Sequence, residues 1–522
     1  MPDVNLAPGA QLLQAERRPL SPALAEAGVF LLILAVVALL RLPSFAPAVV
    51  DTDEGLYMVQ AREWLRGGWP LVAAWDMHPI GAPALYALAF LVFGEGVEAA
   101  RLLGLIFIAL TAYALHWCAR VAGAGRGVGI GAGLIYAGHT LYLGGLCTNT
   151  ELLLAPFVAG AMAIGIAGTV QATGPGARAP GWGAVIAMGA LVGPALVIKQ
   201  VVVPEGSLAF ALLVGPALAR GLLPWRRGLA MAAAYAALCA APFVLVGVVY
   251  WSQGWLEDFL DSSVLAPFNY AMEGVGAAEA MRRVATAGLT LAWAFVAAIV
   301  AVVAWRPDLR SGPVGVLTGI GLLWFLVASF AVAAPGFYFA HYFLLWLPPL
   351  SLLAALGLWQ LAGHMSLMRP RLLYMLLAGM LAANPLLAEA ARLFDRGPGV
   401  VHRDPVREVA AAMRAALGPG EAAFVANYHP TVYVLSGAAL ATRFPFPAHV
   451  TGPFAQLAGT DTDHELERVL ASRPRVIVVD RGWMHTMRPD ATNQVEAALR
   501  AGYRLFATVG EVRGPVEVWR LE

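Results

Sequence analysis

Apolar segments long enough to cross a lipid bilayer recur along the first three quarters of this 522-residue chain. A membrane-spanning helix needs about 20 mostly apolar residues. A chain that is 59% hydrophobic and 13% charged is too apolar for a soluble protein of this size. The sequence therefore predicts an α-helical polytopic membrane protein with about eleven transmembrane helices. They are expected near residues 24–40, 99–118, 127–146, 151–169, 182–199, 201–219, 228–250, 284–304, 314–333, 342–362 and 371–388.

Charge divides the chain into three parts. Residues 1–22 are polar and carry Arg17 and Arg18, so we expect a cytoplasmic N-terminal tail. Residues 23–390 form the transmembrane module. Residues 400–522 hold 13 arginines and 13 acidic residues, which predicts a water-soluble domain. Helix-type and strand-type segments alternate along this domain and predict a small α/β fold. The helices are expected at 404–417, 462–472 and 491–501 and the strands at 424–426, 476–479 and 516–519.

The arginine distribution also predicts the topology. With the N-terminus inside, residues 42–98 form the first extracytoplasmic loop, which contains juxtamembrane helices. The apolar stretch 80–94 is too short to cross, so the C-terminal domain is expected outside as well. Residues 56–69 are expected as a helix lying on the membrane surface, with a loop helix packed on the C-terminal domain as the alternative. The protein is then a multi-pass protein of the cell inner (plasma) membrane.

Three acids within four residues follow the first span, in Asp51-Thr52-Asp53-Glu54, with Tyr57 close behind. Carboxylates cannot stay in hydrocarbon, so this cluster lies at the membrane surface or in a wet cavity. An acid held there can deprotonate one substrate beside another that is held in the lipid. The alternative is an acidic loop that merely stays out of the membrane.

Two further groups on the same side bear on chemistry. The single lysine of the chain, Lys199, ends a span beside Gln200, where it either extends to the interface or meets an anion such as a lipid phosphate. His78 precedes Pro79 and is a candidate metal ligand, phosphate contact or proton shuttle, or else an interfacial histidine. His341 lies in an aromatic run that is otherwise typical of a membrane-interface belt.

Other functions receive no support from the sequence. The net charge of +1 and the near-neutral C-terminal domain give no indication of nucleic-acid binding. The three cysteines lack metal-ligand spacing and predict no disulfide framework. In the C-terminal domain, His429 and Asp480 follow predicted strands, but there is no glycine-rich phosphate loop, and we expect this domain to be non-catalytic.

The order of these features resembles the GT-C glycosyltransferases of the bacterial protein-O-mannosyltransferase type, which are related to the lipid A aminoarabinose transferases. The resemblance covers roughly residues 20–390. One departure is visible, because the usual His/Lys-Pro-Pro-Leu turn reads His78-Pro79-Ile80-Gly81 here. The matching residues are Asp53-Glu54-Gly55 with Tyr57, His78-Pro79, Arg101, Thr150-Glu151, Lys199-Gln200 and the run from His341 to Pro349.

The resemblance implies an inverting transfer of a hexosyl or pentosyl group from a polyprenyl-phosphate donor to an envelope acceptor, which is a lipid, a glycan or a protein. Asp53 would be the base and Glu54 its support. Lys199 and Gln200, with His341, would bind the donor phosphate. His78 and Tyr57 would contact the acceptor. A divalent metal ion is left open as cofactor, with Glu54 and His78 as candidate ligands.

Two alternatives to an enzyme remain at this point. A transporter or flippase of envelope lipid or glycan precursors would also be polytopic, but it favours charges at mid-span and broken helices in matched halves. A non-catalytic scaffold would explain the soluble domain. It gives no reason for acids, a lysine and histidines to gather on one face.

Overall fold

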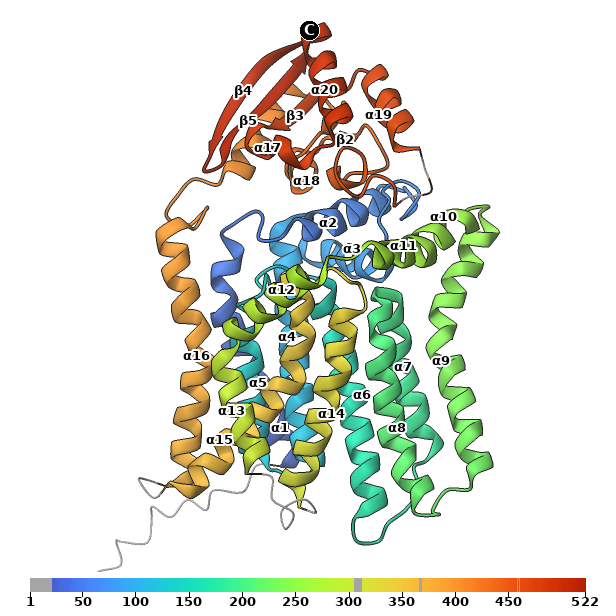
Figure 1. The fold of residues 1–522 in the computed structure, drawn as a ribbon, viewed down its shortest axis with the longest axis vertical. Helices are drawn as coiled ribbons and strands as arrows, with labels where there is room; N and C mark the ends of the chain where they lie inside the picture. The colour runs from blue at the N-terminus through green and yellow to red at the C-terminus, as the bar shows by residue number, and fades with distance from the viewer. Residues whose placement is uncertain (1–20, 305–311, 366–368, 458, 460) are drawn as a thin grey trace, which may run out of the picture.

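A computed structural model of the chain describes residues 21–304, 312–365, 369–457, 459 and 461–522. Almost all of the expected N-terminal tail, including Arg17 and Arg18, lies outside these residues. The rest forms a long helical bundle, a layer of short helices at one end of it, and a small domain with a sheet beyond that layer (Figure 1).

Eight helices in the described part of the chain are long and apolar enough to span a membrane, each with any 3₁₀ turn that continues it. A ninth span would be the bent pair α12 and α13, whose axes differ by 80°. The polytopic helical fold predicted from the sequence is confirmed. The nine are α1 (Pro22–Arg41), α4 (Val97–Val121), α6 (Thr150–Thr173), α8 (Val203–Ala219), α9 (Trp225–Ser252), α12 (Ala277–Thr290) with α13 (Ala292–Val303), α14 (Pro313–Ala333), α15 (Leu347–His364) and α16 (Pro370–Arg396).

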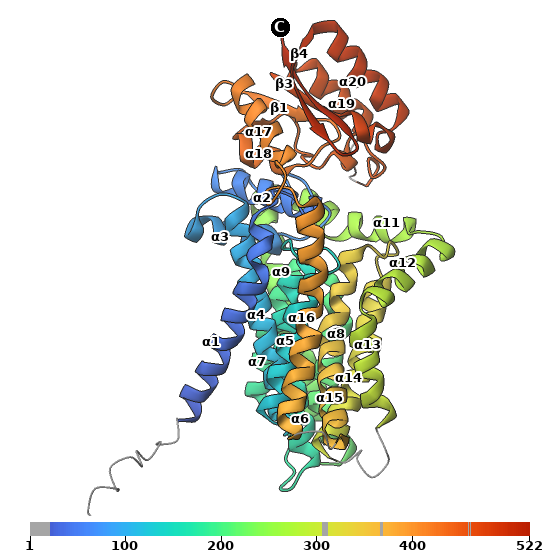
Figure 2. The ribbon, with the colours of Figure 1, turned by 90° about the vertical axis from the view of Figure 1, so that its left-hand side faces the viewer.

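The other two expected spans are shorter than a full crossing. Helix α5 (Arg126–His139) has 14 residues, because the chain leaves the helix for a buried loop over residues 140–149. Helix α7 (Trp182–Ile198) has 17 residues and ends where Lys199 adopts an extended backbone. Both lie within the bundle beside full-length helices, and Figure 2 shows α16 rising along the bundle toward the C-terminal domain.

A layer of short helices separates the bundle from the sheet domain (Figure 1). It contains α2 (Thr52–Leu65), α3 (Gly81–Phe93), α10 (Leu256–Leu260), the π-helical η3 (Asp261–Leu265) and α11 (Ala266–Glu273). Helix α3, with 13 residues, is too short to cross a membrane, as expected for residues 80–94.

The expectation that residues 56–69 lie on the membrane surface is wrong. Every residue of α2 from Glu54 to Arg62 is buried, because the helix packs against α3 and α4 and is covered by the C-terminal domain. A Cβ at Gly55 would lie 2.4 Å from the Thr431 hydroxyl, and Arg62 donates to the Tyr433 carbonyl. The alternative of a loop helix packed on the C-terminal domain describes α2 correctly.

The C-terminal domain is built on a five-stranded mixed sheet of order β2-β1-β3-β5-β4. Strand β1 is parallel to β2 and β3, whereas β5 is antiparallel to both β3 and β4. All predicted helices and strands of this domain are present; α18, β2 and β4 were not predicted. The elements are α17 (Pro405–Ala416), β1 (Ala422–Val425), α18 (Thr431–Ser436), β2 (Ala439–Leu440), α19 (Thr462–Ala471), β3 (Val476–Asp480), α20 (Pro489–Gly502), β4 (Tyr503–Glu511) and β5 (Gly514–Leu521).

Candidate active site

The acid cluster is held by the start of α2. Asp51 is the N-cap of this helix, and its Oδ1 accepts a hydrogen bond from the backbone N–H of Asp53 at 3.2 Å. Aspartate is among the preferred residues at this position, because its side chain satisfies a free N–H of the first turn. The 3₁₀ turn η5 (Ala340–Trp346) adds His341, whose Nδ1 lies 3.2 Å from Asp51 Oδ2 and whose Nε2 lies 3.8 Å from Asp53 Oδ2.

The two aspartates differ in their electrostatic environment. Burial raises the pKa of Asp53 to about 6, and the like charge of Asp51 adds to this increase. Burial acts on Asp51 in the same direction, but the hydrogen bond and positive charge of His341 outweigh it and lower the pKa of Asp51. A carboxylate with a pKa close to neutral pH suits a general base, and Asp53 still has 31% of its side chain exposed to receive a substrate.

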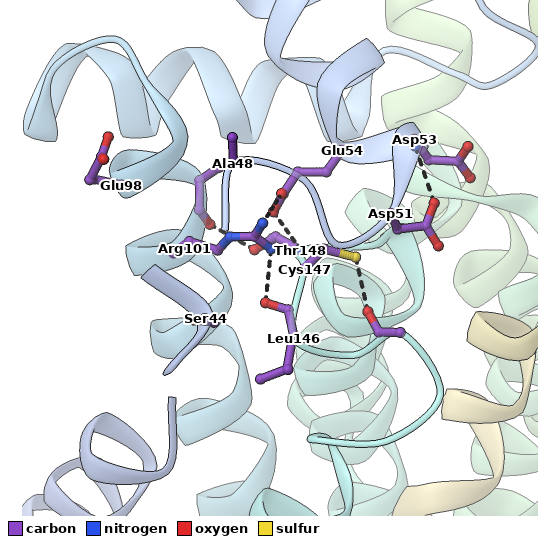
Figure 3. Close-up of polar contacts among 12 residues, drawn as sticks. Ser44, Ala48, Asp51, Asp53, Glu54, Glu98, Arg101, Leu146, Cys147 and Thr148 are labelled. Atoms are coloured by element: carbon purple, nitrogen blue, oxygen red, sulfur yellow. Dashed lines mark hydrogen bonds and ion pairs between the residues drawn. The ribbon is translucent and has the colours of Figure 1, made fainter. Parts of the chain in front are cut away.

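Glu54 points away from the aspartates, into the bundle (Figure 3). Its carboxylate is 2.8 Å from a guanidinium nitrogen of Arg101 and accepts the Thr148 backbone N–H at 2.8 Å. Arg101 also donates to the Leu146 carbonyl, as does Arg41. The two buried arginines thus tie α1, α2 and α4 to the loop over residues 140–149.

A further group contains Asp76, His78 and Tyr57, the last of these from α2. His78 Nδ1 is 2.9 Å from Asp76 Oδ2. Burial raises the pKa of Asp76, but the charge and hydrogen bond of His78 outweigh burial, so the pKa of Asp76 lies below its usual value. Tyr57 is buried, and its ring lies 6.3 Å from that of His78 and 5.8 Å from that of Tyr86. The Asp76–His78 pair is held at the end of the loop that follows α2.

Lys199 and Gln200 line a cavity of about 500 Å³ together with His78. The Lys199 ammonium donates to Glu151 at 2.6 Å and lies 4.7 Å from the centre of the Tyr342 ring. Gln200 is not free, because its amide donates to the Ser263 carbonyl. Most of the remaining wall is apolar and includes Met77, Val201, Val203, Pro204, Phe243 and Phe268.

The predicted residues therefore form two groups rather than one. Lys199, Gln200 and His78 share the cavity, whereas His341, expected near the donor phosphate, turns to Asp51 and Asp53. The groups adjoin, because Tyr342 follows His341 and lines the cavity.

Among the described residues, the three side chains close enough to share a metal ion are Asp51, Asp53 and His341, whose ligand atoms lie within 4.8 Å of one another. Carboxylate oxygens with an imidazole nitrogen suit several divalent cations. The expected ligands Glu54 and His78 are outside this group, since Glu54 is bound to Arg101 and His78 to Asp76.

Some residues of this site were not assigned from the sequence. Asp51 belonged to the acid cluster, and its position one residue before a helix was a usable signal for a cap. Glu151 was named only as a residue that matches the family, yet it is the partner of the only lysine. Tyr270, whose hydroxyl is 3.2 Å from that of Tyr342, comes from a segment with no motif, and nothing in the sequence pointed to it.

No protein-family model and no curated protein sequence matches the chain. Solved structures do match. ArnT from Cupriavidus metallidurans bound to undecaprenyl phosphate has a TM-score of 0.59 at 18% sequence identity, over 94% of this chain and 98% of ArnT. The archaeal oligosaccharyltransferase AglB from Archaeoglobus fulgidus, in complex with an inhibitory peptide and a dolichol-phosphate, has a TM-score of 0.53 at 12% identity, over 94% of this chain and 74% of AglB.

The chain has the GT-C fold. ArnT in the apo state agrees, with a TM-score of 0.60 at 17% identity over 95% of this chain and 98% of that one. The fold class expected from the sequence is therefore confirmed over the membrane part and the C-terminal domain together. The GT-C fold was inferred from motifs before residue 200 and around residue 341, whereas the structural match extends over almost the whole chain.

Proposed function

We propose that this protein is an inverting membrane glycosyltransferase that moves a sugar from a polyprenyl-phosphate donor to an acceptor in the cell envelope. The observation that carries the proposal is the position of Asp53. This partly exposed carboxylate is paired with His341, and the neighbour of His341, Tyr342, lines the apolar cavity that holds Lys199. A base and a cation on adjoining sites are what displacement at an anomeric carbon needs.

The apolar cavity is the proposed donor site. Its wall suits a polyprenyl chain, and Lys199 supplies polar hydrogens for the phosphate. Gln200 can add the second N–H of its amide, since only one is needed for the bond to Ser263. The solved structures of ArnT and AglB contain undecaprenyl phosphate and a dolichol-phosphate, respectively, which supports a lipid phosphate here. Glu151 holds Lys199 in position and moderates its charge, so that the phosphate can also leave.

Asp53 is the proposed general base. It accepts the proton of the acceptor hydroxyl as the acceptor oxygen bonds to the anomeric carbon. The bond from that carbon to the phosphate oxygen breaks, and its electron pair stays on the phosphate, where Lys199 stabilises the charge. Asp51 and His341 position Asp53. The ion pair between Glu54 and Arg101 fixes α2, the helix that carries Asp53.

The same three side chains, Asp51, Asp53 and His341, fit a divalent metal ion. When bound, such an ion would polarise the acceptor hydroxyl. We further propose that the site and the C-terminal domain face the extracytoplasmic side, where lipid-linked sugars and envelope acceptors meet.

Replacing Asp53 tests the proposal. In purified protein supplied with a polyprenyl-phosphate sugar and envelope extract, Asp53→Asn should reduce transfer by about 10²–10⁴-fold, the usual contribution of a general base. Asp490→Asn, an exposed acid in the first turn of α20, is the matched control and should transfer normally. Transfer by Asp53→Asn at the rate of the control would refute the assignment.

A further inference from the structure

A second large cavity lies where the C-terminal domain meets the start of α2. It measures about 690 Å³ and is bordered by Val49, Val50 and Thr52 on the membrane side. On the other side are His429, which follows strand β1, and Asp480, which ends the parallel strand β3. The carboxyl ends of parallel strands are the usual edge at which α/β domains bind ligands.

This cavity adjoins the acid pair through Thr52. The Thr52 hydroxyl is 3.2 Å from His429 Nδ1, and both residues also line a smaller cavity of about 190 Å³. Thr52 stands between Asp51 and Asp53 in the first turn of α2. The donor cavity adjoins the same acids through Tyr342, whose neighbour His341 is 3.2 Å from Asp51. Residues next to the acid pair therefore line both cavities, Thr52 the one and Tyr342 the other.

The acids of this second cavity already accept hydrogen bonds from the protein. Asp404 accepts the backbone N–H groups of Ala48 at 2.7 Å and Val406 at 3.0 Å. Asp480 accepts the Gly482 N–H at 2.8 Å, and Glu511 accepts the Tyr428 hydroxyl. These carboxylates hold the walls together.

Arg513, in contrast, has no such hydrogen-bond partner among the described residues. It lies in the turn between β4 and β5, and its guanidinium carbon is 4.6 Å from the centre of the Trp483 ring. In the part of the chain that the structure describes, its side chain makes no hydrogen bond or ion pair. The cation–π contact holds the guanidinium at the cavity and leaves its N–H groups free. Arg403, also on the wall, is 91% exposed and only loosely paired, at 3.7 Å from Glu408.

We infer that this cavity binds an acidic group of the acceptor, a phosphate or a carboxylate, through Arg513 supported by Trp483. Each carboxylate on the wall accepts a hydrogen bond from the protein, whereas Arg513 keeps its donors free. Arg513 is therefore the charged group placed to bind a ligand, and that ligand is an anion. Naming the ligand as the acceptor rests on the proposed function. The C-terminal domain, expected from the sequence to be non-catalytic, then supplies the acceptor-binding half of the site.

The test measures binding by titration calorimetry, so that it does not depend on sugar transfer. Full-length protein is placed in phosphatidylcholine nanodiscs, with saturating undecaprenyl phosphate to fill the Lys199 cavity. The probes are glucose 6-phosphate, octyl glucoside 6-phosphate and neutral glucose. Wild type should bind both phosphates and not glucose, and Arg513→Gln should weaken phosphate binding by about 10-fold or more, as expected for a charge-assisted hydrogen bond.

Arg504→Gln, a charge-matched change on the exposed part of β4, is the control and should bind like wild type. Equal affinity of wild type for the two phosphates identifies the acidic group itself as the ligand, and tighter binding of the octyl compound identifies a lipid-borne one. Wild-type affinity in Arg513→Gln, or glucose bound as tightly as its phosphate, would overturn the inference. Absence of transfer alongside Arg513-dependent binding would count against the proposed function alone.

Discussion

The buried ion pair between Glu54 and Arg101 allows a quantitative test of how the acid helix is held. The two side chains are 1% and 0% exposed, with 2.8 Å between nitrogen and oxygen. Glu54→Gln leaves Arg101 with only the Leu146 carbonyl as acceptor, and removing one partner of a buried pair costs about 3–5 kcal/mol. The glutamine amide can still accept the Thr148 N–H, so we expect a loss of about 3 kcal/mol, at the lower end of this range.

The assay is the free energy of unfolding in a bilayer, measured by steric trapping for wild type, Glu54→Gln, Arg101→Met and the double variant. Because the double variant leaves no unpaired charge, it should be less destabilised than the sum of the single variants by about 2 kcal/mol. Glu98→Gln, which breaks an exposed ion pair with Arg407 at 3.3 Å, is the control and should cost less than about 1 kcal/mol. A loss for Glu54→Gln as small as that of this control would refute the reasoning.

Three more outcomes are expected. Because Asp53, with its pKa raised to about 6, must be unprotonated to act, kcat/KM should fall below about pH 6. Asp51→Asn removes a like charge and should move this fall to lower pH; an unmoved profile would contradict the coupling. Lys199→Ala should raise the donor KM and lower kcat in steady-state assays, and an unchanged kcat/KM would exclude Lys199 from the site. In a cysteine-free background, a membrane-impermeant maleimide applied to intact cells should label Val512→Cys and not Pro175→Cys, and the reverse pattern would invert the topology.

The sequence was sufficient for those features that depend on local composition. Hydropathy located the long helices, a continuous apolar run located β3 and apolar–polar alternation located β5, because each signal is contained in one segment. The span at 127–146 was overestimated, since hydropathy does not show that the chain leaves α5 at His139. The prediction at 182–199 differs from α7 only at Lys199, where the backbone becomes extended.

Contacts between side chains from distant segments could not be predicted from the sequence. Lys199 and Glu151 are 48 positions apart, and both were noticed without being joined. Glu54 and Asp53 are neighbours on one helix, where successive side chains point in different directions, so the acid motif divides between an ion pair in the bundle and the open site. The sequence alone does not determine which of these two acids faces the bundle and which faces the open site.

The covering of α2 by the C-terminal domain has a consequence for how the protein is made. Translation delivers the first span and α2 early, whereas Thr431 and Tyr433, which cover α2, are synthesised near the end. Until then α2 lacks the cover of the C-terminal domain, and the Arg62 guanidinium has Glu63 but not the Tyr433 carbonyl as a partner. A chain that stops short of residue 430 would therefore insert its membrane helices and still present an unfinished α2 to the proteases that survey the membrane.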